Sequence, residues 1–236
     1  MMPRIVEVRK NILKKNDLAA AALRDRFRAA GVFVVSLVSS PGAGKTAFLE
    51  RTLALVAAGH RAAALVGDLA TECDAARLRR SNVPVRQITT GTVCHLDAEM
   101  VQRALDGWPL GDLEYVFIEN VGNLVCPASY DLGEHLRVVL VSVTEGEDKP
   151  LKYPTIFNTA DVAVITKIDL AAAVDCDRAA LLHNIESVRP GMPVVEASAK
   201  TGDGLSDWLT LLERRRAAAP ALSAAAGAIL PSRSST

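Results

Sequence analysis

Short apolar runs alternate with helical stretches along most of the chain. Runs rich in β-branched residues occupy 32–38, 62–66, 83–88, 115–118, 138–143, 162–165 and 194–195. Segments with apolar residues at helical spacing lie between most of them, at 44–58, 71–80, 96–106, 176–188 and 204–218. Runs that are apolar on both faces are typical of parallel strands with helices on either side. The order predicts an α/β fold, a doubly wound and mostly parallel sheet with helices on both faces.

The two ends of the chain depart from this pattern. Residues 5–30 carry apolar side chains at helical spacing, which predicts an N-terminal helical extension over 1–30. Asn16 and Asp17 could divide that extension into two helices. After 217 the composition shifts to Ala, Ser, Pro and Gly, which predicts a disordered tail over 218–236. Residues 31–217 are then expected to form the main domain.

The first apolar run leads directly into SSPGAGKT at 39–46. A strand, a glycine-containing loop and a helix in this order define the P-loop, whose backbone N–H groups surround phosphate at a helix N-terminus. Lys45 is expected to reach the β- and γ-phosphates, and the Thr46 hydroxyl to bind Mg²⁺. Ser39 replaces the usual first Gly, and the alternative is a strand-to-helix turn with an accidental Gly-Lys-Thr. The predicted phosphate contacts are Pro41, Gly42, Ala43, Gly44, Lys45, Thr46 and Ala47.

A second motif favours GTP over ATP. The segment TKID at 166–169 follows an apolar run and is similar to the guanine-reading motif NKxD. The Asp169 carboxylate is expected to accept hydrogen bonds from guanine N1–H and the exocyclic amine, while Lys167 lies over the base. Thr166 replaces the usual Asn, and Asp169 could instead be a helix cap. The segment at 198–200 is similar to a second base loop, with Ser198, Ala199 and Lys200 as the expected contacts.

Two acidic residues end apolar runs on the side of the sheet where this fold class binds ligands. Asp68 follows one run and Glu119 another, and Gly122 lies at the spacing of a γ-phosphate-sensing switch. One carboxylate is expected to hold Mg²⁺ and the other to orient the attacking water, so Lys45, Asp68 and Glu119 are the predicted catalytic residues. The sequence does not divide the two carboxylate roles, and either residue could merely cap a turn.

A cysteine–histidine set forms a candidate metal site. Cys94 and His95 precede the helical stretch 96–106, and Cys126 follows the switch-like segment. Two thiolates and an imidazole suit Zn²⁺ or Ni²⁺. A ligand so close to Gly122 could move when the nucleotide changes. The alternative is two buried, apolar cysteines and a histidine that caps a helix.

Charge and composition exclude several classes of protein. Lys and Arg total 27, as do Asp and Glu, which argues against a nucleic-acid binder. No apolar run is long enough for a membrane span, and the first residues show no secretion signal. The four cysteines include no CxxC pair, which suits thiols or metal ligands rather than disulfides. We therefore expect a cytoplasmic protein without nucleic-acid or membrane partners.

Several segments together resemble the hydrogenase nickel-incorporation GTPases, the HypB family of the SIMIBI class of P-loop proteins. The matching segments lie at 39–46, 67–71 with 74–75, 90–95, 118–127 and 144–154. The resemblance covers about residues 5 to 215, and IENVGNLVCP and TEGEDKPLKYP are its most specific parts. A serine at the first P-loop position looks normal for this family.

The resemblance implies a metallochaperone that hydrolyses GTP slowly and helps to deliver nickel to the [NiFe]-hydrogenase large subunit. It implies GTP or GDP and Mg²⁺ as cofactors, Ni²⁺ or Zn²⁺ on Cys94, His95 and Cys126, and a nucleotide-dependent homodimer. A nickel-delivery partner chaperone is a further expected partner. The N-terminal cysteine motif and the His-rich stretch of some members are missing, so nickel storage is not expected. The alternatives are a sister GTPase for urease or cobalamin enzymes and a small-molecule P-loop kinase.

Overall fold

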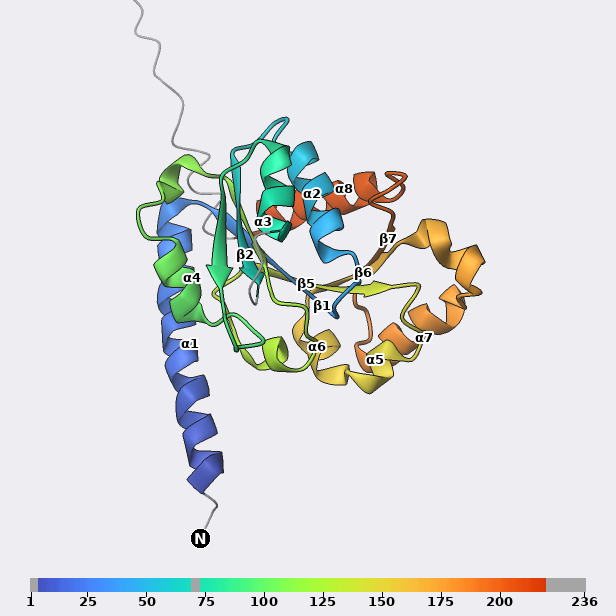
Figure 1. Cartoon of the computed structure of the whole chain (residues 1–236), viewed down its shortest axis with the longest axis horizontal. Helices are drawn as coiled ribbons and strands as arrows, with labels where there is room; N and C mark the ends of the chain where they lie inside the picture. The colour runs from blue at the N-terminus through green and yellow to red at the C-terminus, as the bar shows by residue number, and fades with distance from the viewer. Residues whose placement is uncertain (1–3, 69–72, 220–236) are drawn as a thin grey trace, which may run out of the picture.

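The computed structural model describes residues 4–68 and 73–219, with side chains from residue 10 onward (Figure 1). Its α-helices are α1 (Arg4–Ala30), α2 (Lys45–Val56), α3 (Cys73–Leu78), α4 (Ala98–Ala104), α5 (Lys149–Lys152), α6 (Pro154–Thr159), α7 (Arg178–Val188) and α8 (Leu205–Ala217). Its strands are β1 (Phe33–Ser39), β2 (Ala62–Asp68), β3 (Val85–Thr89), β4 (Tyr115–Glu119), β5 (Leu136–Ser142), β6 (Val162–Thr166) and β7 (Val194–Ala197). Four short 3₁₀ segments are η1 (Arg79–Ser81), η2 (Leu110–Asp112), η3 (Cys126–Ser129) and η4 (Ile168–Val174).

The seven strands form one sheet in the order β3-β2-β4-β1-β5-β6-β7. Every neighbouring pair is parallel, so the predicted doubly wound sheet is confirmed. All seven apolar runs became strands. The central strands are buried on both faces and are therefore largely apolar, whereas the edge strands β3 and β7 are only partly buried. In β1, for example, every residue is buried.

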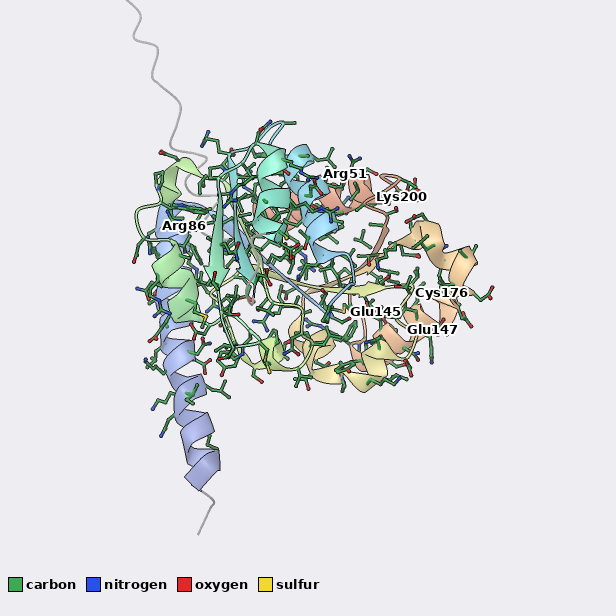
Figure 2. The ribbon with its side chains drawn as sticks, in the orientation of Figure 1. Arg51, Arg86, Glu145, Glu147, Cys176 and Lys200 are labelled. Atoms are coloured by element: carbon green, nitrogen blue, oxygen red, sulfur yellow. The ribbon has the colours of Figure 1, made fainter. Side chains whose placement is uncertain are left out.

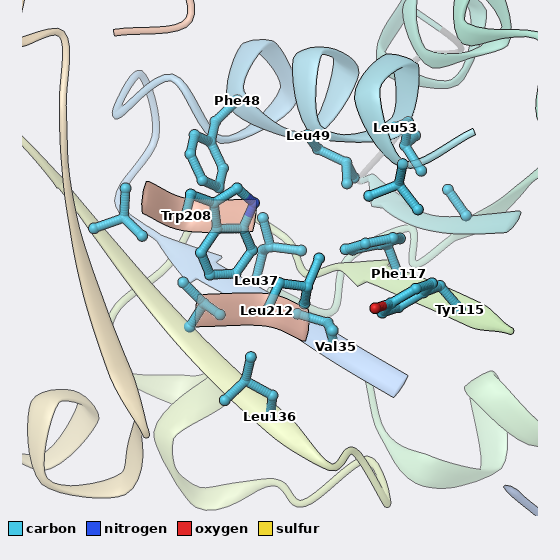
Figure 3. Close-up of a cluster of buried hydrophobic side chains, with 14 of the residues drawn as sticks. Val35, Leu37, Phe48, Leu49, Leu53, Tyr115, Phe117, Leu136, Trp208 and Leu212 are labelled. Carbon is cyan, nitrogen blue, oxygen red and sulfur yellow. The ribbon is translucent and has the colours of Figure 1, made fainter. Parts of the chain in front are cut away.

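Two helical layers cover the sheet (Figure 1). On one face, α2, α3 and α8 pack on a core that includes Phe48, Trp208 and Phe117 (Figure 3). On the other face, α1 and α4 cover the β1–β4–β2 side, and α6 and α7 cover β5 and β6. Burying both faces fixes the strands, so the loops at their carboxyl ends have a rigid base.

The helix α1 is unbroken, so the predicted division at Asn16 and Asp17 is wrong. Asparagine is a weak helix former because its side chain competes for nearby backbone groups. Here the Asn16 side chain is buried and bonds elsewhere, to Asp131 O and Ala98 N, so it does not interrupt its own helix. None of the described helices combines the length and apolar character that a membrane crossing requires.

Two helices were not predicted, and two expectations fall outside the description. The helices α5 and α6 have only four and six residues, which is too short for apolar residues to show a helical period. Each has a proline in its first turn, a position that tolerates proline. The tail beyond 219 and residues 69–72, which include part of one family-like segment, lie outside the described residues.

Candidate nucleotide and metal site

The phosphate loop connects β1 to α2 and lines a cavity of about 490 Å³. Gly42 and Gly44 have φ angles of +78° and +87°, in the left-handed region that L side chains rarely adopt. Gly44 is also the N-cap of α2, so the loop ends where the helix dipole is positive. The cavity is lined by residues 39–47 together with Asp68, Asp74, Arg77, Val121 and Gly122. The geometry suits a polyphosphate.

Glu119 is fully buried and bonds to two of the residues that line this cavity. Its Oε1 accepts hydrogen bonds from Lys45 Nζ at 2.8 Å and from Thr46 Oγ1 at 2.7 Å. Its Oε2 is buried and has no hydrogen-bond partner among the described residues. Because a buried carboxylate oxygen without a partner is costly, this atom fits a place reserved for a cation or a water molecule. Asp68 ends the neighbouring strand β2 and lines the same cavity.

The predicted base-binding residues surround a second cavity of about 240 Å³ beside the phosphate loop. Thr166 Oγ1 donates to Ala43 O at 2.6 Å, and Lys167 Nζ donates to Gly42 O at 2.7 Å. Ser198 Oγ donates to Asp169 Oδ1 at 2.6 Å. The cavity is lined by Gly44, Ala47, Phe48, Thr166, Lys167, Asp169, Leu170, Ser198, Ala199 and Lys200. The two predicted base-reading segments, 166–169 and 198–200, therefore meet each other and the phosphate loop.

Cys94, His95 and Cys126 come together although His95 and Cys126 are 31 positions apart in the sequence. One ligand atom from each lies within 4.8 Å of the others, and the two Sγ atoms are 3.1 Å apart. Burial lowers the pKa of His95 below the ordinary value, against the opposing charge of Asp97, which favours the neutral imidazole that binds metal ions. His95 Nδ1 is buried and finds no hydrogen-bond partner among the described residues. The donor set and this nitrogen both fit a thiophilic divalent metal.

The segment from Glu119 to Cys126 joins the phosphate cavity to the cysteine–histidine set. A Cβ on Gly122 would come within 3.1 Å of Pro41 Cα, so the segment lies directly against the phosphate loop. Asn123 Nδ2 donates to Cys94 O at 3.3 Å. Cys126 begins η3 three residues later. One short stretch of backbone therefore contacts both candidate sites.

Sequence reasoning missed several residues of this region. Arg77 and Asp74 line the phosphate cavity, but neither was predicted as a nucleotide contact, and Asp74 entered only through the family-like segment 74–75. Glu145 contacts the Ser40 hydroxyl and accepts from Ser142 N at 2.8 Å, so it holds the phosphate loop from the β5 side. Glu145 lies in the segment TEGEDKPLKYP, whose sequence indicates the family resemblance but predicts no contact with the phosphate loop.

The remaining cysteines and histidines lie elsewhere. Cys73 is exposed at the start of α3. Cys176 lies before α7 rather than within a helix, next to Glu147, and lines neither cavity (Figure 2). His60 and His135 do have partners: His60 contacts Glu114 and Glu213, and His135 Nδ1 accepts from Val34 N.

Comparison with known proteins places the chain in a family. The model of the CobW/HypB/UreG nucleotide-binding domain matches residues 33–196. The hydrogenase maturation factor HypB of Azotobacter vinelandii is 49% identical over 215 residues, which cover 90% of this chain and 70% of that protein.

Two solved structures agree. HypB from Helicobacter pylori in complex with nickel has a TM-score of 0.80 and 41% identity, covering 86% of this chain and 95% of that one. HypB from Archaeoglobus fulgidus also has a TM-score of 0.80, with 37% identity and 86% and 99% coverage. The expected resemblance is confirmed, and the chain belongs to the CobW/HypB/UreG family of nucleotide-binding proteins, in its HypB group of hydrogenase maturation factors.

Proposed function

We propose that this chain is a GTP-hydrolysing metallochaperone that assists nickel insertion into the [NiFe]-hydrogenase large subunit. The names of its relatives and the nickel complex of the Helicobacter structure support this proposal. The observation that carries it is the stretch 119–126, which contacts the phosphate loop at one end and holds a candidate metal ligand at the other. That connection favours a nucleotide-controlled metal site over a simple hydrolase.

For hydrolysis, the proposed residues are Lys45, Thr46, Asp68 and Glu119. Lys45 pairs with Glu119 at 2.8 Å, and a polyphosphate bound in the cavity would compete for the Lys45 ammonium. Glu119 is then free to orient a water molecule or, with Asp68 and Thr46, to hold Mg²⁺. A magnesium ion at this position would neutralise charge on the phosphates. Asp169 selects guanine, and Thr166 and Lys167 connect the base cavity to the phosphate loop.

For metal handling, the proposed ligands are Cys94, His95 and Cys126, with Ni²⁺ as cargo and Zn²⁺ as a competitor for the same donors. Three protein ligands leave room for a further ligand, which suits transfer better than storage. We further propose a GTP-dependent homodimer, contacts with a nickel-delivery chaperone and the hydrogenase large subunit, and a cytoplasmic location. Residues 31–217 form the proposed GTPase domain that contains both sites, and residues 1–30 form its helical extension.

The experiment is a nickel titration of the nucleotide-free, GDP-bound and GTP-analogue-bound protein. We expect nickel affinity to differ at least fivefold between nucleotide states, in the range of typical coupling free energies. Cys126→Ala should weaken nickel binding and abolish that difference. Cys176→Ala is the matched control, because this cysteine lines neither cavity. Equal nickel affinities in all three states, unchanged in Cys126→Ala, would contradict the proposal.

A further inference from the structure

Three asparagine side chains hold the backbone around Cys94 and His95. Asn123 Nδ2 donates to Cys94 O at 3.3 Å. Asn120 Oδ1 accepts from Leu96 N at 3.0 Å. The third bond comes from a distant part of the chain: Asn16 Oδ1, on α1, accepts from Ala98 N at 2.9 Å. The segment is therefore fixed both from the nucleotide side and from the N-terminal helix.

Asn16 also reaches the segment that follows Cys126. Its Nδ2 donates to Asp131 O at 2.9 Å, so one amide bridges the segment that follows His95 and the segment that follows Cys126. Ala98 lies three residues after His95, and Asp131 five residues after Cys126. Asn16 is only 6% exposed, so its hydrogen bond from Ala98 N is buried and its bond to Asp131 O is partly shielded from water.

The second loop packs against α1 at further points. Arg24 forms an ion pair with Asp131 at 2.6 Å. A Cβ on Gly133 would come within 2.8 Å of Ala20 O, so the loop backbone lies directly on the helix. The Tyr130 ring, next to Asp131, lies over the His95 ring with centroids 4.0 Å apart. A shift of this loop on α1 would therefore move both Cys126 and the ring that packs on His95.

We propose that Asn16 is a positioning residue for the metal site. Its amide sets the distance between the segment with Cys94 and His95 and the segment with Cys126. The inference rests on the proposed metal function. It means that α1, as well as the bound nucleotide, affects the geometry of the metal site. Removing residues that orient metal ligands typically costs ten- to a hundredfold in affinity.

The test uses the full chain with two readouts. The first is nickel affinity. The second needs no metal: the equilibrium constant for forming a Cys94–Cys126 disulfide against oxidised glutathione, which reports how well the two thiols are aligned. We expect Asn16→Ala to lower each constant about tenfold. Asn16→Asp keeps an acceptor for Ala98 N but loses the donor to Asp131 O, so it should fall between the wild type and Asn16→Ala.

The control is Tyr115→Phe, which removes a partly buried hydrogen bond to Glu213 at the opposite end of the sheet. A purely structural Asn16 would behave like this control, with a lower melting temperature and both constants unchanged, and that result would overturn the proposal. If Asn16→Ala does not fold, Arg24→Ala loosens the same loop from a partly exposed position and should change both constants in the same direction. If the wild type and Cys126→Ala bind nickel equally, the metal function fails, but the disulfide equilibrium still decides the role of Asn16.

Discussion

At the amino end of the sheet, Glu114 accepts hydrogen bonds from three groups, whereas at the carboxyl end Glu119 uses only one of its oxygens. Glu114 Oε1 contacts His60 and Arg216, and its Oε2 accepts from Arg61 N. Glu119 Oε1 accepts from Lys45 and Thr46, and its Oε2 has no hydrogen-bond partner among the described residues. The two carboxylates lie at opposite ends of the same strand, β4, so their different hydrogen bonding reflects the different roles of the two ends of the sheet.

The fully bonded cluster stabilises the fold, and the incompletely bonded one leaves atoms for ligands. At the amino end, Glu213 accepts from Tyr115, and Arg216 lies over the Tyr115 ring, so α8 is attached to the sheet. At the carboxyl end, Glu119 Oε2 and His95 Nδ1 are both buried at predicted sites and find no hydrogen-bond partner within the described part of the chain. Native proteins rarely leave buried polar atoms unpaired, so such atoms mark where a ligand is expected.

The largest effect should come from Glu119→Gln. The amide keeps the shape but loses the charge that orients water or holds a cation, so GTP turnover should fall about 1000-fold. Glu213→Gln at the amino end is the matched control, with normal turnover and a lower melting temperature. The measurements are GTP turnover and the melting temperature of both variants. An unchanged turnover rate in Glu119→Gln would contradict a catalytic role for the carboxyl end of the sheet.

Asp169→Asn should have the next largest effect, on nucleotide affinity. The variant loses two charge-assisted hydrogen bonds to guanine, each worth about 1.5 kcal/mol or more, so GDP should bind about 100-fold more weakly. ATP affinity should stay as it is. Calorimetric titration with both nucleotides measures the ratio, and an equal loss for GDP and ATP would show that Asp169 is structural.

Thr166→Val should have a smaller effect. The isosteric change removes the hydroxyl that donates to Ala43 O and leaves that carbonyl buried without this bond, at a cost of about 1 kcal/mol or slightly more. We expect GDP affinity to fall about tenfold, because the base cavity and phosphate loop lose a direct connection. Fluorescent GDP displacement is a suitable measurement, and wild-type affinity would mean that the threonine is a neutral replacement at this position.

The smallest effect concerns pH and the amino end. Burial alone would raise the pKa of Glu114, but hydrogen bonds from Arg61 N, His60 and Arg216 hold it at about 2, below the ordinary 4.5. The stabilisation is therefore present above pH 4.5 and is lost as the pH falls towards 2. Glu114→Gln should melt a few degrees lower at pH 7, and its difference from the wild type should shrink over that window. A difference independent of pH would contradict the assignment.

Most of the fold could be predicted, because strands buried on both faces leave long apolar runs. Which strands become neighbours is not visible in those runs. The residue types of Cys94, His95 and Cys126 suggested a metal site. Spacing alone could not show that the three side chains meet, because the proximity of Cys94 to Cys126 depends on the path of β4 and of the loops beside it. The role of Asn16 was hidden for the same reason, since its partners lie 82 and 115 residues away.

Charged residues outside the recognised nucleotide-binding and metal-binding motifs were the hardest to assign to the site. Arg77 and Asp74 reach the phosphate cavity only because α3 packs next to α2 at the carboxyl end of the sheet. Glu145 lies three residues beyond β5 and turns back to Ser40, a contact across 105 positions. Such contacts depend on tertiary packing, and local sequence patterns do not contain them.

The most direct test of the account is the reciprocal of the nickel titration. Because coupling between two binding sites acts equally in both directions, nickel must change the affinity for a non-hydrolysable GTP analogue by the same factor by which the analogue changes nickel affinity. We predict at least a fivefold change in the dissociation constant of the analogue at saturating nickel, absent in Cys126→Ala and retained in Cys176→Ala. An identical dissociation constant with and without nickel would show that the two sites are independent and would contradict the account.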